Sequence, residues 1–431
     1  PENVIIERDI FNVVNHDIDV MVELIGGVDV AKDLILKALK KKKHVVTANK
    51  AVIYNHGDEI FACAKENGVK VLFESSVCAG TPIIKLLTEE LSANKISKIS
   101  GMLNGTSNFI LSNMEDGAEF QSTLELAQKE GYAEPDPSFD IEGMDAAHKI
   151  GILSSLALGT PLPPDDFYVQ GITNIKKIDF KYADEMGYTI KHLAVAEQNS
   201  KEVVLRAHPV LIAKDSYLAN LKSVRNGIEV ETDLLGTLHL AGSGAGQEST
   251  ASGIISDLVH LANSSGEHLK AVSNEKVILS EFLNLTFQYY FYIEAKDIPG
   301  VMASITSVFA DKSVGIETIV QKENLDENFV PIVIITDPFK EQDHSNLIEN
   351  LEKLDSIKIA KKLFPDVIFI CEDLSITINQ KWVKEIKDCD LCVMLQAEIG
   401  TKNNHLFELN NITTTFQILK VLKKYKIKRL I

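Results

Sequence analysis

The chain has 431 residues, of which 45% are hydrophobic and 24% are charged, and its net charge is −17. This length exceeds one ordinary core, so we expect two to four domains, and the composition excludes a largely disordered or fibrous protein. The acidic balance and the absence of a bilayer-length apolar run predict no nucleic-acid partner, no membrane span and a cytoplasmic location.

The first segment alternates strands and helices. We expect strands over 20–25, 44–47 and 69–73, and helices over 29–43 and 56–67. This order is typical of a doubly wound parallel sheet, which binds ligands at the carboxyl ends of its strands. Three turns fall there: Gly26-Gly27, Thr47 to Lys50, and the stretch from Glu74. A ligand edge explains all three together better than ordinary turns do.

No G-x-G-x-x-G turn of the dinucleotide-binding kind precedes Val20. Such a turn lets the pyrophosphate approach a helix N-terminus. The glycine run from Gly242 to Gly246 comes late and has the wrong spacing. We therefore expect a partial Rossmann-like sheet, with the natural chain beginning about 60 residues upstream, roughly one β-α-β unit.

The middle segment contains the densest group of charged residues. Carboxylates occur at Glu134, Asp136, Asp140, Glu142 and Asp145. Asp145 and Lys149 are four apart, so a helix would place them on one face. Ordinary capping and pairing is the alternative. The prolines and glycine of this loop favour a site, in which carboxylates hold a cationic substrate group and the lysine moves a proton.

Two further candidates follow strands of the first segment. Lys50 ends a strand-turn where a ligand would lie, although a solvated lysine is the common alternative. The stretch from Glu74 to Pro82 is rich in small residues. A carboxylate and exposed carbonyls suit a hard cation, and an interdomain hinge is an equal alternative.

The last segments have a different order. Strands over 287–293, 316–321 and 330–336 and helices over 302–312 and 344–354 predict a ferredoxin-like β-α-β-β-α unit. Beyond it we expect strands over 366–370 and 391–395 around a helix over 380–386, an unassigned α/β-like tail. The Lys-rich end, 420–429, is interpreted as a solvated helix face, with a partner-binding helix as the alternative.

These residues resemble the homoserine dehydrogenase family. The stretch Ala127 to Lys149 fits its signature at Gly131-Tyr132-Ala133, Asp136-Pro137, Asp140-Ile141, Gly143, Asp145 and Lys149. The flanks agree at 22–27, 44–50, 104–108 and 242–253, and the likeness extends over roughly Asp19 to Leu354. The resemblance implies an NAD- or NADP-dependent enzyme that interconverts L-homoserine and L-aspartate 4-semialdehyde in threonine, methionine and isoleucine biosynthesis.

It also implies an organisation in four parts. Three of them are a partial nucleotide-binding domain over 1–82, an α+β catalytic and dimerisation domain over 83–280 and a regulatory ACT domain over 285–360. The fourth, the unassigned tail over 361–431, resembles no part of this family. An ACT domain implies an amino-acid effector at the turn from Asp297 to Val301. In this family the effector is usually threonine. The family further implies a homodimer or a larger homo-oligomer.

The family's functional residues carry over by position. Lys149 would be the general acid and base, and Lys50 would assist it at the nicotinamide. The substrate would contact Glu134, Asp145 and Asp140. The cofactor would contact Lys50, Thr47, Asn49, Gly131 and Gly246. A sodium-like monovalent cation would be held by Glu74 and the carbonyls of Val77, Ala79 and Thr81, where Cys78-Ala79 replaces the more usual Ala-Gly.

Two other functions fit parts of the sequence. A catalytically impaired remnant, acting as a regulatory or dimerisation protein, would explain the missing glycine turn. A different Rossmann dehydrogenase acting on an amino acid or semialdehyde would need a nucleophilic cysteine, and Cys78 has no histidine near it in sequence. The set Lys50, Glu134, Asp145 and Lys149 favours homoserine dehydrogenase over both.

Overall fold

The computed structural model describes residues 7–164, 167–199, 202–263, 278–279, 285–321, 329–340 and 344–365. The strands and helix expected after residue 365, and the Lys-rich end, lie outside these residues. Among the described residues, no helix is both long enough and apolar enough to cross a membrane.

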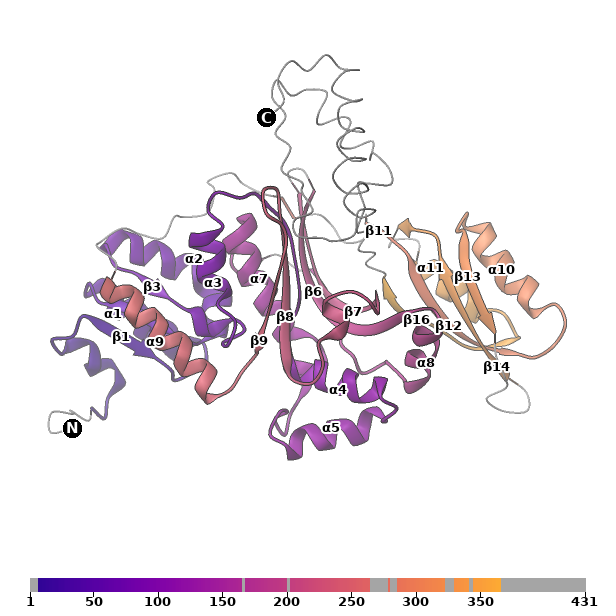
Figure 1. Ribbon diagram of the computed structural model, residues 1–431, viewed down its shortest axis with the longest axis horizontal. Helices are drawn as coiled ribbons and strands as arrows, with labels where there is room; N and C mark the ends of the chain where they lie inside the picture. The colour runs from indigo at the N-terminus through magenta and orange to yellow at the C-terminus, as the bar shows by residue number, and fades with distance from the viewer. Residues whose placement is uncertain are drawn as a thin grey trace, which may run out of the picture. The chain divides into compact units, whose positions relative to one another are not determined.

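A three-stranded parallel sheet opens the chain (Figure 1). After a 3-10 helix, η1 (Ile10–Asn15), come β1 (Val20–Glu23), α1 (Asp29–Lys40), β2 (His44–Thr47), α2 (Lys50–Asn67) and β3 (Val71–Leu72). The strands lie in the order β1-β2-β3. The predicted parallel β-α-β-α-β order is therefore confirmed for these elements.

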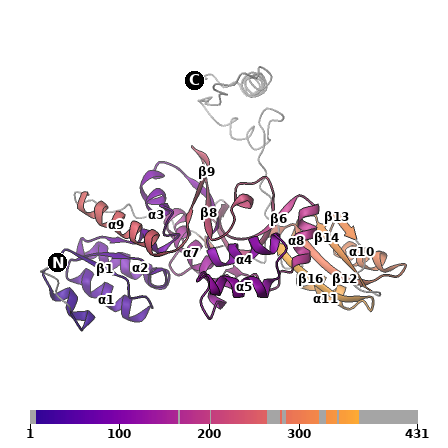
Figure 2. The ribbon, with the colours of Figure 1, turned by 60° about the horizontal axis from the view of Figure 1, so that its bottom comes forward.

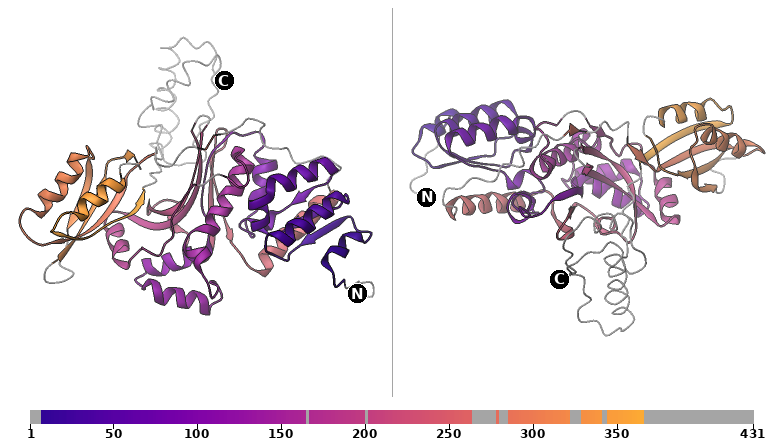
Figure 3. Two further views of the ribbon diagram at one scale, coloured as in Figure 1. Left: turned by 180° about the vertical axis from the view of Figure 1, so that it is seen from behind. Right: turned by 90° about the horizontal axis from the view of Figure 1, so that it is seen from above.

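The helix expected over 56–67 begins earlier, at Lys50. Asn49 caps it, because its side-chain oxygen accepts the N–H of Val52 at 3.2 Å. His56 has non-helical backbone angles, which kink α2 at the point where the sequence pattern suggested a start. Figures 2 and 3 show α1 and α2 on one side of the small sheet and α9 (Gln247–Asn263), from much later in the chain, on the other.

A larger mixed sheet forms the middle of the chain. Its strands are β4 (Ile96–Met102), β5 (Tyr168–Val169), β6 (Tyr188–Asn199), β7 (Glu202–Ala213), β8 (Arg225–Thr232), β9 (Gly236–Ser243) and β10 (Ile278–Leu279). The order is β10-β7-β6-β4-β8-β9, with β5 beside β7. β8 and β9 form an antiparallel hairpin, and β6, which the sequence pattern did not indicate, lies between β4 and β7.

Short helices connect the two sheets: η2 (Glu74–Ser76), α3 (Ile83–Lys85) and the π-helix η3 (Leu86–Glu90). Further helices flank the larger sheet: α4 (Gly105–Glu115), α5 (Phe120–Lys129), α6 (Ser138–Ile141), α7 (Met144–Leu158), α8 (Lys177–Glu185) and the 3-10 helix η4 (Leu218–Asn220). α7 packs on β6 and β7 through Ala146, Ala147 and Ile150, all buried. It begins at Met144 because Gly143, with φ of +89°, turns the chain into it.

The third part has the order β-α-β-β-α-β. It contains β12 (Tyr289–Lys296), α10 (Val301–Asp311), β13 (Ile316–Gln321), β14 (Phe329–Thr336), α11 (His344–Glu352) and β16 (Ile357–Pro365), with β11 (Thr286–Phe287) paired to β15 (Phe339–Lys340). The sheet order β13-β14-β12-β16 is ferredoxin-like, and α10 and α11 cover one face (Figure 1). β16 was not predicted, and it continues past the expected boundary at 360.

Alternation along β12 divides its side chains between two cores. Tyr289, Phe291 and Ile293 pack under α10 and α11. Tyr290 and Tyr292 face the other way and share a core with α4, α8 and the larger sheet. The Tyr290 hydroxyl donates to Asp179 of α8 at 3.2 Å. The ferredoxin-like unit is thus packed against the middle of the chain through its open sheet face.

Candidate active site

One buried carboxylate joins two lysines from different elements. Asp145 lies in the first turn of α7 and is 6% exposed. One of its oxygens pairs with Nζ of Lys50, the first residue of α2, and the other lies 2.8 Å from Nζ of Lys149. The Lys149 pairing is the contact predicted from the helical spacing. The Lys50 pairing connects residues 95 positions apart and could not be inferred from spacing.

The N-terminus of α4 supports this cluster. Asn104 caps the helix by accepting the N–H of Ser107 at 2.7 Å, and its Nδ2 donates to Asp140 at 2.7 Å and to Asp145 at 2.9 Å. The hydroxyl of Thr106 donates to the second oxygen of Asp140 at 3.1 Å. Asp140 is therefore held next to Asp145 by neutral donors, and it contacts neither lysine directly.

Charge and burial set the protonation of the cluster. Burial opposes ionisation of Asp145, but the ammonium groups of Lys149 and Lys50 outweigh it and hold the carboxyl pKa well below its usual range. Burial also opposes the ammonium form of Lys149, and Asp145 outweighs it, so that pKa is raised. For Lys50 burial dominates and, with repulsion from Lys149, lowers the pKa. Burial raises the pKa of Asp140.

Aromatic rings enclose the exposed side of Lys50. Its Nζ lies 5.0 Å from the centre of the Phe139 ring, a cation–π contact. His148 stacks on Tyr54 with ring centres 3.8 Å apart and meets Phe139 edge-on. Burial and the nearby Lys50 charge lower the pKa of His148 to about 4, so it is neutral near pH 7.

Three of the predicted ligand residues, all within the described part of the chain, form no hydrogen bond or ion pair with this cluster. Glu134 is exposed, and its backbone carbonyl, rather than its carboxylate, accepts a hydrogen bond from Gln128. Gly131 and Gly246 are exposed glycines with φ of +77° and +123°. Lys50, Asp140, Asp145 and Lys149 are thus joined by ion pairs or by the shared donor Asn104, and the roles of Glu134, Gly131 and Gly246 stay predictions.

The carboxyl ends of β1 and β2 are tied together by a residue that the sequence did not single out. Glu23 is 1% exposed and accepts the hydroxyl of Thr47 at 2.6 Å and the N–H groups of Ile25 and Gly26 at 2.8 and 3.3 Å. Asn49 donates to the carbonyl of Gly27 at 2.8 Å. Thr47 and Asn49 therefore shape the predicted ligand edge. The sequence offered one sign that Glu23 is important, because it is an acidic residue at the end of a buried strand.

The predicted cation loop is buried and closely packed. Both oxygens of Glu74 accept backbone N–H groups, from Ile84 at 2.8 Å and from Lys85 at 3.0 Å, and burial raises its pKa. Val77, Ala79 and Thr81 are buried, and the Thr81 hydroxyl has no hydrogen-bond partner. The carboxylate of Glu74 and the backbone carbonyls of this loop are hard oxygen donors, of the kind that alkali and alkaline-earth cations bind. A set of three His, Cys, Asp or Glu side chains suited to a metal ion does not occur among the described residues.

Cys78 cannot serve as an activated nucleophile in this environment. It is 1% exposed, its φ is +50°, and Asn226 donates to its sulfur at 3.0 Å. Burial raises the pKa of the Cys78 thiol, the opposite of what a catalytic thiolate requires. A cysteine-dependent semialdehyde dehydrogenase is therefore not supported.

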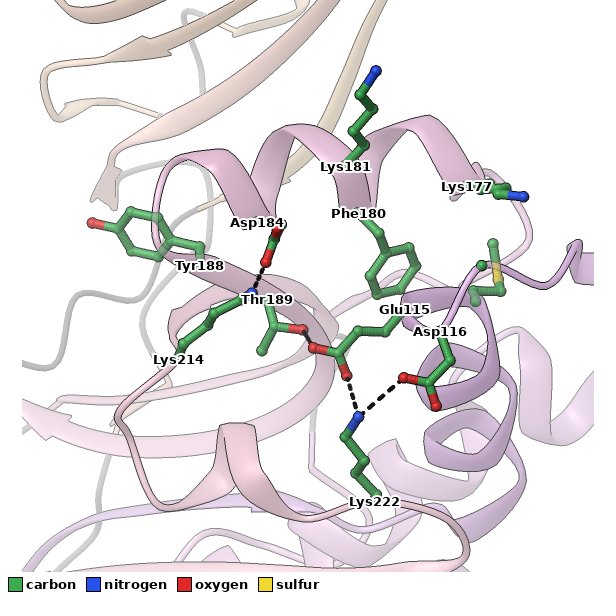
Figure 4. Close-up of a pocket in the computed structure, with 12 residues that line it drawn as sticks. Glu115, Asp116, Lys177, Phe180, Lys181, Asp184, Tyr188, Thr189, Lys214 and Lys222 are labelled. Carbon is green, nitrogen blue, oxygen red and sulfur yellow. Dashed lines mark hydrogen bonds and ion pairs between the residues drawn. The ribbon is translucent and has the colours of Figure 1, made fainter.

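A separate hollow of about 480 Å³ lies between α8, the end of α4 and the start of β6 (Figure 4). Its charged groups largely satisfy one another: Lys214 pairs with Asp184, and Lys222 pairs with Glu115 and Asp116. Lys181 points away from the hollow in Figure 4. None of the predicted site residues lines it, so the lysine–carboxylate cluster remains the candidate active site.

A parallel sheet with a shaped ligand edge, next to buried lysines that share a carboxylate, is typical of nucleotide-dependent oxidoreductases. The profile of the homoserine dehydrogenase NAD-binding domain matches residues 2–74, and that of the homoserine dehydrogenase catalytic domain matches residues 82–259. The chain belongs to the homoserine dehydrogenase family, NAD(P)-dependent oxidoreductases that act on a CH–OH group.

Individual relatives agree over most of the chain. Homoserine dehydrogenase of Pseudomonas aeruginosa is 44% identical over 366 residues, which are 82% of this chain and 84% of the relative. The crystal structure of the enzyme from Thiobacillus denitrificans matches with a TM-score of 0.78 and 40% identity, covering 84% of this chain and 85% of that one. A hyperthermophilic archaeal homoserine dehydrogenase solved with NADPH matches with a TM-score of 0.54 and 29% identity, covering 61% and 78%.

Proposed function

We propose that the chain interconverts L-homoserine and L-aspartate 4-semialdehyde, with Lys149 as the proton-transferring group. The observation that carries this role is the pairing of Lys149 and Lys50 with one buried carboxylate. A bound nicotinamide, NAD or NADP, supplies the hydride acceptor or donor at the carbon that bears the oxygen. In the reductive direction the Lys149 ammonium donates its proton to the developing alkoxide, and in the oxidative direction the neutral amine takes the hydroxyl proton.

The neighbouring groups have distinct roles in this proposal. Asp145 orients both lysines and keeps Lys149 protonated until the aldehyde oxygen gains charge. Lys50, whose pKa is lowered, assists at the nicotinamide side without adding a second strong acid. Asp140 and the exposed carboxylate of Glu134 bind the substrate ammonium group. Thr47, Asn49, Gly131 and Gly246 contact the cofactor, in support of which Thr47 and Asn49 lie at the carboxyl ends of the parallel strands.

We further propose a monovalent cation held by Glu74 and the carbonyls of Val77, Ala79 and Thr81. The unpaired, buried hydroxyl of Thr81 in the same loop supports it. The cation would neutralise the buried Glu74 carboxylate and fix the loop between the two sheets, a structural contribution.

The ferredoxin-like unit, taken as an ACT domain over 285–360, is proposed to bind an amino-acid effector, threonine, at the turn ending in Gly300. The β-α-β-β-α-β order and the φ of +92° at Gly300 support this. The family relation supports a homodimer or larger assembly, and the free thiols of Cys63 and Cys78 suit a cytoplasmic location.

An assay of the purified full chain tests the proposed activity. We expect homoserine-dependent reduction of NAD or NADP that Lys149→Ala abolishes. No turnover with either cofactor, in a chain that unfolds cooperatively, would instead support a regulatory or dimerisation protein.

A further inference from the structure

A buried amide bridges the loop of Cys78 and the anchor of Lys149. Asn226, near the start of β8, is 0% exposed. Its Nδ2 donates to the carbonyl of Leu103 at 3.0 Å and to the sulfur of Cys78 at 3.0 Å. The same Leu103 carbonyl accepts the Nζ of Lys149 at 2.6 Å. One carbonyl oxygen therefore receives both the lysine ammonium and the asparagine amide.

The chemistry of these groups fixes the orientation of the amide. The Leu103 carbonyl can only accept, so the NH₂ group of Asn226 must face it. A carbonyl oxygen has two lone pairs, and Lys149 and Asn226 take one each. The Oδ1 atom of Asn226 is buried and has no hydrogen-bond partner.

The glycine run after β9 makes room for this amide. A Cβ atom on Gly244 would lie 2.3 Å from Oδ1 and 2.6 Å from Nδ2 of Asn226. Gly242 pairs with Asn226 across the β8–β9 hairpin, and a Cβ there would lie 2.5 Å from the carbonyl of Gly80. The run is therefore required for close packing against Asn226 and the loop that follows β3.

We infer that Asn226 is a positioning residue for Lys149, an inference that rests on the proposed acid–base role of Lys149. An ammonium group has three N–H donors. Asp145 and the Leu103 carbonyl take two of them, which leaves one for the substrate oxygen. Asn226 fixes the Leu103 carbonyl, so it fixes the direction of the remaining donor. Gly244 contributes because it has no side chain that would displace the Asn226 amide.

The test compares Asn226→Leu with Asn108→Leu in the full-length chain. Asn108 is 3% exposed, donates to the carbonyls of Leu221 and Arg225, and also has a buried unpaired Oδ1. Asn108→Leu is therefore the same substitution in a similarly buried site, but Asn108 does not bond the Leu103 carbonyl that holds Lys149. We expect Asn226→Leu to lower kcat about ten- to a hundredfold with little change in the KM for homoserine. We expect Asn108→Leu to lower thermal stability while kcat stays close to wild type.

The pH profile separates positioning from general destabilisation. Loosening the Leu103 carbonyl weakens a hydrogen bond that favours the charged lysine, so the pKa of Lys149 falls. In Asn226→Leu the limb of kcat/KM that reports this lysine should move to lower pH, and in Asn108→Leu it should not. Gly244→Ala, which retains the amide but displaces it, should give a smaller shift in the same direction.

Each outcome decides one statement. Equal kcat and equal pH profiles for the two leucine variants would overturn the inference and make Asn226 a packing residue. If Asn226→Leu does not fold, Gly244→Ala decides: an unchanged profile overturns the inference. Turnover that survives Lys149→Ala would contradict the proposed role of Lys149 itself, whatever Asn226 does.

Discussion

Asp145 pairs with two lysines whose pKa values are shifted in opposite directions: that of Lys149 is raised and that of Lys50 is lowered. Asp145→Asn should lower kcat/KM by about a hundredfold or more, because both lysines lose their common counter-charge. The pKa of Lys149 should fall, and the pH profile should move to lower pH. Two buried ammonium groups without a counter-charge should also cost about 3 kcal/mol of unfolding free energy.

Steady-state kinetics and urea unfolding measure both effects. Asp136→Asn is the matched control, since Asp136 belongs to the same carboxylate-rich stretch of the sequence but is exposed and bonds only locally, to Ser138. If Asp136→Asn impaired turnover as much as Asp145→Asn, the shared carboxylate would have no special role.

His192 gives the protein a pH-dependent stability. It is 4% exposed, its Nε2 lies 2.9 Å from the carbonyl of Gln170, and its Nδ1 has no partner. Burial lowers its pKa from 6.5 to about 4, so between these values the unfolded state binds more protons than the native state. Stability should therefore fall as the pH drops through this window. The contribution from His192 between pH 7 and pH 5 is about 2 kcal/mol.

Urea unfolding at pH 7 and pH 5 checks this, with His192→Gln as the comparison. Glutamine can still donate to Gln170 and does not titrate, so the variant should lose less stability on acidification than the wild type. Equal losses in the two proteins would show that His192 is not the group responsible.

At the residue scale, the sequence predicted a side-chain contact that is set by helical spacing, and it missed the contacts between residues far apart in the chain. The Asp145–Lys149 pair follows from a four-residue interval. Glu23 and Asn226 are ordinary residues in strand sequences, and their importance comes from partners that the fold brings from far along the chain. Lys50 was predicted from its place after a strand, yet its partner could not be.

At the scale of elements, the ends of β1 and β2 form one unit through Glu23. Glu23→Gln replaces charge-assisted hydrogen bonds to Thr47, Ile25 and Gly26 with weaker ones, which loosens the turn at the ligand edge. We expect the KM for the nicotinamide cofactor to rise about five- to tenfold, with a smaller change in kcat.

Cofactor titrations in the kinetic assay measure this change. Glu59→Gln is the control, because Glu59 pairs with Lys32 at the surface of α1 and α2 and this pair does not include Glu23, Thr47 or the turn that follows β1. A cofactor KM that rises equally in both variants would assign the effect to the stability of the first sheet rather than to its edge.

Element boundaries were predicted well where local signals are strong and poorly where pairing decides. β2 and β13 have the predicted limits. β6 contains Lys191 and His192 among its apolar residues, so its sequence lacks clear alternation, and it is a strand because β4 and β7 flank it. β16 likewise carries several lysines and is fixed by its pairing with β12.

At the scale of the whole molecule, the contact between the ferredoxin-like unit and the middle of the chain offers a continuous route to the active site. Tyr290 of β12 donates to Asp179 of α8, and α8 packs on β6. His192 of β6 lies against Gly143, where α7 and Asp145 begin. If threonine binds the unit, a change in its sheet can reach Asp145 through packed elements without a long-range charge effect.

Tyr290→Phe tests this route, because it removes the hydroxyl and keeps the ring in its core. We expect activity without effector to stay near wild type and the threonine concentration for half inhibition to rise about tenfold, a coupling of roughly 1.4 kcal/mol. Tyr168→Phe, which removes a tyrosine hydroxyl bonded to Gln170 instead, is the control. Unchanged inhibition in Tyr290→Phe would mean that the effector acts through other contacts of the unit, such as the pair between Glu294 of β12 and Lys176 at the start of α8.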